Sequence, residues 1–269
     1  MQAHICRSYL FVPANRIDRV AKAHAAGPHA VIVDLEDAVA PADKAAAREA
    51  AVQGLPGTEP VFVRVNGPET EWFEEDLKMC AALRVRGLIV PKAETPEQLR
   101  HAATRMQPEA VVLPLIETAR GFANAPLLCE VPGVQRLVFG SIDFQLDLDI
   151  TGEGEELLYF RSGLVLASRL AGIQSPVDGV TVDINDLERV RADTLRGKRL
   201  GFGGKLCIHP KQVAVVNQCF EPTPEEIAWA RRIVDAANAA KGAAIAVDGK
   251  MVDRPVLVNA ERLLADVGH

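Results

Sequence analysis

Cysteine is scarce in this chain of 269 residues. The five thiols are odd in number and widely spaced, without a Cys-x-x-Cys pair, which argues against a disulfide framework and a structural zinc site. No hydrophobic run approaches the length that spans a bilayer, and the apolar stretch at 9–12 is too short for a signal peptide. We therefore expect reduced thiols and a cytoplasmic protein that does not interact with a membrane.

An excess of basic residues is also missing. The formal net charge is -6, which leaves no basic surface of the kind that nucleic acid or an anionic membrane requires. The sequence contains no low-complexity stretch, no linker rich in Gly or Ser, and no internal repeat. With 48% hydrophobic and 25% charged residues, the chain can bury a large core. Small molecules are the expected partners.

Eight short apolar runs alternate with longer amphipathic segments, and we expect each run to be a strand. The runs are 8–12, 30–35, 61–65, 87–90, 111–116, 136–139, 177–180 and 205–208. Between them lie helical patterns such as 41–52 and 95–102, which open with N-cap or first-turn residues. A strand followed by a helix, eight times over, predicts a TIM (β/α)8 barrel.

The rhythm changes after the eighth run. Thr223 and Pro224 open a strong helical pattern that continues to about Ala239. A loop or short strand at 242–247, a turn at 248–249 and a last helix at 254–264 follow. We predict a catalytic barrel domain over residues 1–220 and a C-terminal helical extension over residues 221–269.

Charged and polar residues follow nearly every predicted strand, where a TIM barrel places its active site. They are Asp34, Glu36, Asp37, Arg64, Asn66, Lys92, Glu117, Asp143, His209 and Lys211. Any one of them could be a solvated loop residue or a helix cap, and Asp37 is the best candidate for a cap. Six strand ends together favour a functional site, in which Asp34 and Glu36 could support a metal or Arg64.

Glu117 and Asp143 follow two runs that are consecutive along the chain. Neighbouring strands would bring these carboxylates to the same mouth of the barrel, where a hard divalent cation could be shared with an oxygen-rich substrate. The pattern therefore predicts metal-assisted chemistry on a small carboxylic acid.

Seven motifs, in order along the chain, resemble the citrate lyase beta subunit and malyl-CoA lyase group of the HpcH/HpaI aldolase superfamily. They are Arg7-Ser8-x-Leu10-Phe11-Val12-Pro13, Asp34-Leu35-Glu36-Asp37-Ala38-Val39, Val63-Arg64-Val65-Asn66, Val90-Pro91-Lys92, Ile116-Glu117-Thr118-Ala119-x-Gly121, Phe139-Gly140-x-x-Asp143 and Ile208-His209-Pro210. The resemblance implies a lyase dependent on Mg²⁺, with Mn²⁺ as a substitute. Such an enzyme makes or breaks a carbon–carbon bond between acetyl-CoA, or a related thioester, and a 2-oxo acid.

The resemblance also implies roles for individual residues. Glu117 and Asp143 match the metal ligands, and Arg64 matches the arginine that binds the oxygens of the acid or enolate. An arginine suits this role because its planar guanidinium is always protonated. Arg7 lies in the motif associated with the CoA thioester. The remaining residues expected around the substrate are Glu36, Asp37 and Asn66.

The acid or base at the acetyl carbon is expected in the C-terminal segment, where Asp253 matches it. In relatives that have this segment, it covers the active site of a neighbouring subunit, so we expect a homo-oligomer, either a trimer or a hexamer. The alternative role of Asp253 is to cap the helix that Pro255 opens.

Other activities remain open. A malyl-CoA-type thioesterase would use the same metal site, and no residue separates it from a lyase. The beta subunit of a multi-subunit citrate lyase is a further alternative, against which the Asp253 segment argues. The sequence does not identify the oxo acid among those that form citryl-, malyl- or citramalyl-CoA.

Overall fold

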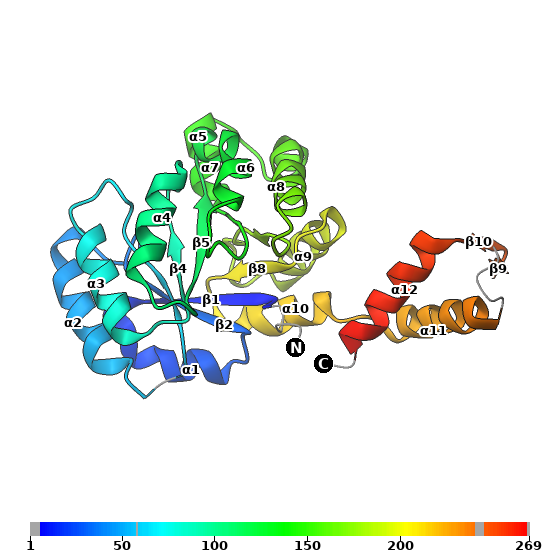
Figure 1. The fold of residues 1–269 in the computed structure, drawn as a ribbon. Helices are drawn as coiled ribbons and strands as arrows, with labels where there is room; N and C mark the ends of the chain where they lie inside the picture. The colour runs from blue at the N-terminus through cyan, green and yellow to red at the C-terminus, as the bar shows by residue number, and fades with distance from the viewer. Residues whose placement is uncertain (1–5, 58, 240–244, 268–269) are drawn as a thin grey trace. The chain divides into compact units, whose positions relative to one another are not determined.

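The computed structural model describes residues 6–57, 59–239 and 245–267 (Figure 1). It divides into two compact units, of which the first extends to Asn217 and the second begins at Gln218. Across the described residues, no helix is both long and apolar enough to cross a membrane. All five cysteines are buried thiols.

The first unit is a closed barrel in which each strand pairs in parallel with the next, and β8 pairs with β1. The strands are β1 (Ser8–Pro13), β2 (Ala30–Asp34), β3 (Phe62–Arg64), β4 (Gly87–Val90), β5 (Val111–Ile116), β6 (Val138–Phe139), β7 (Val177–Asp178) and β8 (Gly204–Cys207). Helices surround the strands (Figure 1). The TIM barrel predicted from the sequence is therefore confirmed.

Helices follow the strands in the expected alternation. They are α1 (Val20–Ala25), α2 (Lys44–Gly54), α3 (Phe73–Leu83), α4 (Pro96–Arg105), α5 (Ala119–Ala123), α6 (Ala125–Cys129), α7 (Ser141–Leu148), α8 (Leu158–Leu170), α9 (Leu187–Leu200) and α10 (Pro210–Phe220). Short 3-10 helices add η1 (Ala14–Arg19), η2 (Pro41–Asp43) and η3 (Glu155–Leu157). Helix α4 begins with a full capping box, in which Thr95 Oγ accepts from the backbone N–H of Gln98.

Apolar side chains from all eight strands fill the barrel interior. They are Tyr9, Ala30, Ile32, Phe62, Ile89, Leu113, Leu115, Val138, Val177 and Leu206. The fully buried guanidinium of Arg136 binds Cys6 O and Ser175 O, each at 2.8 Å. These carbonyls lie just outside the first residues of β1 and β7, so Arg136 ties together backbone at the N-terminal end of the barrel.

The second unit contains α11 (Pro224–Ala239), the antiparallel strands β9 (Ile245–Val247) and β10 (Lys250–Val252), and α12 (Arg254–Val267). Helix α11 begins at Pro224, as the sequence predicts, and Thr223 and Glu226 form a capping box at its start. Asp248 and Gly249 have φ angles of 51° and 75°, as a two-residue hairpin turn requires. Part of the predicted segment 242–247 lies outside the described residues.

Candidate active site

The carboxyl ends of β2 and β3 place Asp34 and Arg64 side by side, because these two residues are register partners in the sheet. Arg64 Nε donates to Asp34 Oδ1 at 2.7 Å, and Arg64 Nη2 donates to Asp34 Oδ2 at 2.6 Å. The guanidinium carbon also lies 5.0 Å from the centre of the Phe11 ring. This two-pronged contact fixes the plane of the guanidinium at the mouth of the barrel.

Two more carboxylates contact Arg64. Its Nη1 lies 2.9 Å from Glu36 Oε2 and 3.3 Å from Asp37 Oδ2. Burial alone would lower the pKa of Arg64, but the hydrogen bonds and negative charges of these partners outweigh burial and raise it. Arg64 therefore stays cationic in a site where only 11% of its side chain is exposed.

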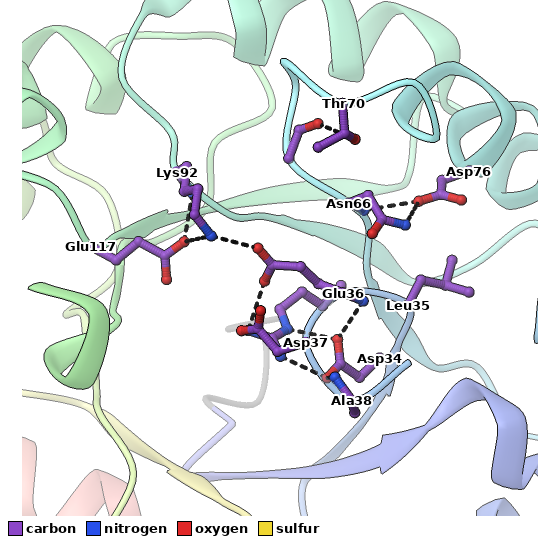
Figure 2. Close-up of polar contacts among 12 residues, drawn as sticks. Asp34, Leu35, Glu36, Asp37, Ala38, Asn66, Thr70, Asp76, Lys92 and Glu117 are labelled. Carbon is purple, nitrogen blue, oxygen red and sulfur yellow. Dashed lines mark hydrogen bonds and ion pairs between the residues drawn. The ribbon is translucent and has the colours of Figure 1, made fainter. Parts of the chain in front are cut away.

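The loop that carries Glu36 and Asp37 is held from within the protein. Asp34 Oδ1 accepts from the backbone N–H of Glu36 at 2.9 Å (Figure 2). The buried ammonium of Lys44 donates to Leu35 O at 2.6 Å and to Glu36 O at 2.7 Å. Burial lowers the pKa of Lys44. These bonds set the positions from which Glu36 and Asp37 reach Arg64.

Lys92 follows β4 and joins two carboxylates that come from different strands. Its Nζ donates to Glu36 Oε1 at 2.8 Å and lies 3.6 Å from Glu117 Oε1 (Figure 2). Its backbone N–H donates to the same Glu117 oxygen at 2.8 Å. Charged side chains from β2, β3, β4 and β5 are thus linked in one network from Asp34 to Glu117.

Glu117 follows β5 and is 1% exposed. Its Oε2 is buried and has no hydrogen-bond partner among the described residues. A Cβ added at Gly140 would lie 2.7 Å from this oxygen, so the glycine leaves room for the carboxylate. Burial, followed by the charge of Glu36, raises the pKa of Glu117 to about 8; Lys92 opposes the shift and Asp143 adds to it.

Asp143 occupies a different place from the one predicted. Strand β6 ends at Phe139, and the chain enters helix α7 at Ser141, so the half-buried Asp143 lies in the first helical turn and not at a strand end. Its negative charge nevertheless contributes to the raised pKa of Glu117. The prediction that Asp143 lies at a strand end was wrong, whereas its role as a metal ligand stays a prediction.

These two carboxylates fit a hard divalent cation. Mg²⁺ is commonly bound through one or two carboxylates and keeps several waters, in contrast to metals that need a closed protein cage. Within the described parts of the chain, no three His, Cys, Asp or Glu side chains form such a cage. The unpartnered Oε2 of Glu117 and the nearby Asp143 match the smaller donor set.

Asn66 and Asp37 make contacts that the sequence did not specify. The backbone and amide N–H groups of Asn66 both donate to Asp76 Oδ2, at 2.8 and 2.7 Å, so the buried Asn66 is bound to α3. Asp37 is exposed and pairs with Arg64, whereas the next helical segment, η2, begins at Pro41. Asp37 therefore belongs to the charged network and caps no helix.

Arg7 is not brought to this site. It precedes β1, at the N-terminal end of the barrel, where its guanidinium donates to Gly203 O at 3.3 Å. The six residue-to-residue steps from Arg7 to Pro13 place it roughly 20 Å from the active-site end. Arg16 and Arg19, which follow β1 in η1, are exposed basic residues at that end.

In the second unit, Asp253 caps helix α12. Its Oδ1 accepts from the backbone N–H of Val256 at 3.3 Å, and the residue is exposed. The capping contact uses Oδ1 of Asp253, so Oδ2 is not used by this hydrogen bond.

The chain was compared with known proteins. The family model described as HpcH/HpaI aldolase/citrate lyase matches residues 7–210. A citrate lyase subunit beta-like protein from Deinococcus radiodurans is 42% identical, with 97% of each chain covered. A (3S)-malyl-CoA thioesterase from Cereibacter sphaeroides is 35% identical over 98% of this chain and 95% of that protein.

The comparison with solved structures gives a similar result. The protein CitE from Mycobacterium tuberculosis, in complex with magnesium, acetoacetate and coenzyme A, has a TM-score of 0.89. It is 34% identical, with 99% of both chains covered. The chain therefore belongs to the HpcH/HpaI aldolase/citrate lyase family and is an enzyme of the lyase type.

Proposed function

We propose that the protein is a Mg²⁺-dependent carbon–carbon lyase that forms or cleaves a citryl-, malyl- or citramalyl-type CoA thioester. The observation that carries this proposal is the buried Oε2 of Glu117, which has no hydrogen-bond partner in the described part of the chain. It lies near Asp143 and is linked through Lys92 and Glu36 to Arg64. The complex of CitE with magnesium, acetoacetate and coenzyme A supports the same ligand classes.

Glu117 and Asp143 would hold the cation, which when bound polarises the oxygens of the oxo acid. Arg64 would donate hydrogen bonds to the same acid, because its guanidinium is cationic and held in a fixed plane by Asp34. Both functions concentrate positive charge where an oxyanion develops.

In the synthetic direction, Asp253 removes a proton from the methyl group of acetyl-CoA. The resulting thioester enolate attacks the carbonyl carbon of the 2-oxo acid and forms the new carbon–carbon bond. The carbonyl oxygen becomes an alkoxide, which Arg64 stabilises and water protonates. Cleavage is the reverse, in which Asp253 returns the proton to the acetyl carbon.

The proposed assembly is a homo-oligomer, either a trimer or a hexamer, in which the C-terminal unit packs on a neighbouring subunit. Asp253 would then enter the neighbour's active site. For the CoA phosphates, we assign Arg16 and Arg19 in place of Arg7, because only the former follow a strand at the end that carries Glu117.

A thioesterase is the second candidate, because a relative with 35% identity is a (3S)-malyl-CoA thioesterase. The test is to incubate the purified protein and Mg²⁺ with malyl-, citramalyl- and citryl-CoA and identify the products by mass spectrometry. Acetyl-CoA plus glyoxylate, pyruvate or oxaloacetate indicates a lyase, whereas free CoA plus the intact hydroxy acid indicates a thioesterase. A Glu117→Gln variant serves as the control.

Two further outcomes decide the remaining alternatives. Cleavage of a citryl thioester on an acyl-carrier protein, without activity on CoA thioesters, would assign the beta subunit of a multi-subunit citrate lyase. Absence of products from every substrate, in protein that binds Mg²⁺, would contradict the proposal.

A further inference from the structure

Lys92 has an unusual backbone conformation for its residue type. Its φ angle is 48°, in the left-handed region that favours glycine. Such a conformation in a residue other than glycine is strained and persists where surrounding contacts fix it. Here the contact is the backbone N–H, which donates to Glu117 Oε1 at 2.8 Å. The backbone of Lys92 therefore orients Glu117 without using the ammonium.

The ammonium has a separate contact. Lys92 Nζ is 2.8 Å from Glu36 Oε1, within hydrogen-bond distance, but 3.6 Å from Glu117 Oε1. Figure 2 shows Nζ between the two carboxylates. The second oxygen of Glu36 lies 2.9 Å from Arg64 Nη1. Glu36 is thus shared by two cations, one on each of its oxygens.

This sharing matters because Glu36 is near the candidate metal ligands. The charges of Glu36 and Asp143 both act on Glu117. A divalent cation between Glu117 and Asp143 would attract Glu36 as a third carboxylate. Each additional carboxylate on a six-coordinate cation would replace a water or an oxygen of the substrate. A metal site that must also bind an oxo acid therefore has to keep Glu36 away.

We propose that the ammonium of Lys92 is a positioning group that retains Glu36 beside Arg64 and keeps it out of the metal's coordination sphere. The cation is then held by Glu117 and Asp143 alone and keeps open positions for the 2-oxo acid. This inference rests on the proposed function. It adds that Lys92 determines how many positions on the cation are open to the 2-oxo acid.

The test replaces Lys92 by methionine and counts the exchangeable waters on bound Mn²⁺, from the broadening of its electron paramagnetic resonance lines in ¹⁷O-enriched water. We expect fewer waters in Lys92→Met than in the unchanged protein. A Lys92→Met/Glu36→Gln double variant should recover the lost water, because the competing carboxylate is gone. Compared with the unchanged protein, the Mn²⁺-loaded Lys92→Met variant should bind pyruvate with an affinity lower by at least about tenfold. The affinity of this variant for Mn²⁺ should be about tenfold higher.

The controls separate this effect from general changes of charge or folding. Lys92→Arg keeps the cation and should retain the water count, whereas Lys78→Met removes an exposed lysine on α3 and should change nothing. Lys92→Gly accepts the left-handed backbone without strain and keeps the N–H bond to Glu117, so it replaces Lys92→Met if that variant misfolds.

An unchanged water count in both Lys92→Met and Lys92→Gly, with Mn²⁺ bound, would overturn the role of Lys92. The metal site itself would still stand if Glu117→Gln abolished Mn²⁺ binding. If the unchanged protein bound neither Mn²⁺ nor Mg²⁺, the proposed function and the role of Lys92 would fail together.

Discussion

Arg64 and Asp34 meet edge to edge, with two parallel hydrogen bonds of 2.7 and 2.6 Å. Because the two residues end adjacent strands, the contact orients the guanidinium relative to the whole barrel. Glu36 and Asp37 contact the remaining Nη1. The site therefore holds a cation in a fixed orientation before any substrate arrives, which is the condition for efficient stabilisation of an oxyanion.

This arrangement predicts that Arg64→Lys lowers kcat by about 100-fold or more. Lysine keeps the charge, but it cannot make the two parallel bonds to Asp34 or donate in the same plane. Steady-state kinetics with the substrate found in the product assay measures the loss, and thermal unfolding checks the fold. An Arg64→Lys enzyme with nearly normal kcat would remove Arg64 from the mechanism. Asp34→Asn should reduce kcat as well, because it weakens the two hydrogen bonds that orient the Arg64 guanidinium.

Removing a metal ligand should abolish cation binding. In Glu117→Gln and Asp143→Asn, a neutral amide replaces a charged ligand in a site that has two candidate carboxylates, so the affinity for Mn²⁺ should become undetectable by titration calorimetry. Asp149→Asn is the matched control, since Asp149 is an exposed carboxylate beside the same helix and asparagine tolerates its φ of 55°. Wild-type affinity in either ligand variant would contradict the assignment.

The buried Arg136 predicts a large effect on stability. Its guanidinium binds Cys6 O and Ser175 O at 2.8 Å and Pro176 O at 3.3 Å, and Arg136→Met would leave these carbonyls without that donor. We expect a loss of about 3 kcal/mol or more in the free energy of unfolding, measured with urea. Arg100→Met, which breaks an exposed pair with Glu97, should cost less than about 1 kcal/mol. Equal losses in the two variants would show that the buried contacts contribute little.

The sequence predicted the barrel well because strand burial leaves a strong pattern. The bounds of β4 and β5 agree with the predicted runs 87–90 and 111–116, and the other strands agree within two residues at each end. These runs are apolar because both faces of a barrel strand are covered, by the interior on one side and by helices on the other. Turn residues then mark where each run stops.

The site was harder to predict because its contacts depend on the path of the loops. Lys44 donates to carbonyls eight and nine residues earlier in the chain, and Lys92 reaches Glu36 across β3. No spacing in the sequence signals either contact. The place of Arg7 could have been deduced, because a residue that precedes a strand lies at the opposite end from the active site. Asp143 was wrongly assigned to a strand end. Strand β6 is only two residues long and helix α7 begins two residues after it, so the apolar run in the sequence does not show where the strand stops.

Asp253 is predicted to be the acid or base at the acetyl carbon and to act across a subunit interface. Asp253→Asn is well suited to test this, because asparagine caps a helix as well as aspartate does but cannot exchange the proton. The variant should unfold at the temperature of the unchanged protein and lose nearly all lyase activity. Asp253→Ala should also lose about 1 kcal/mol of stability, because the cap of α12 is removed.

The subunit question is tested by mixing two inactive proteins. Asp253→Asn retains the metal ligands, and Glu117→Gln retains Asp253, so subunit exchange forms some sites that contain both. Activity should return in the mixture, and exchange itself can be verified by native mass spectrometry of differently tagged chains. If exchange occurs and activity does not return, Asp253 acts within its own chain or has no catalytic role. Full activity of Asp253→Asn alone would restrict this residue to its structural role as the cap of α12.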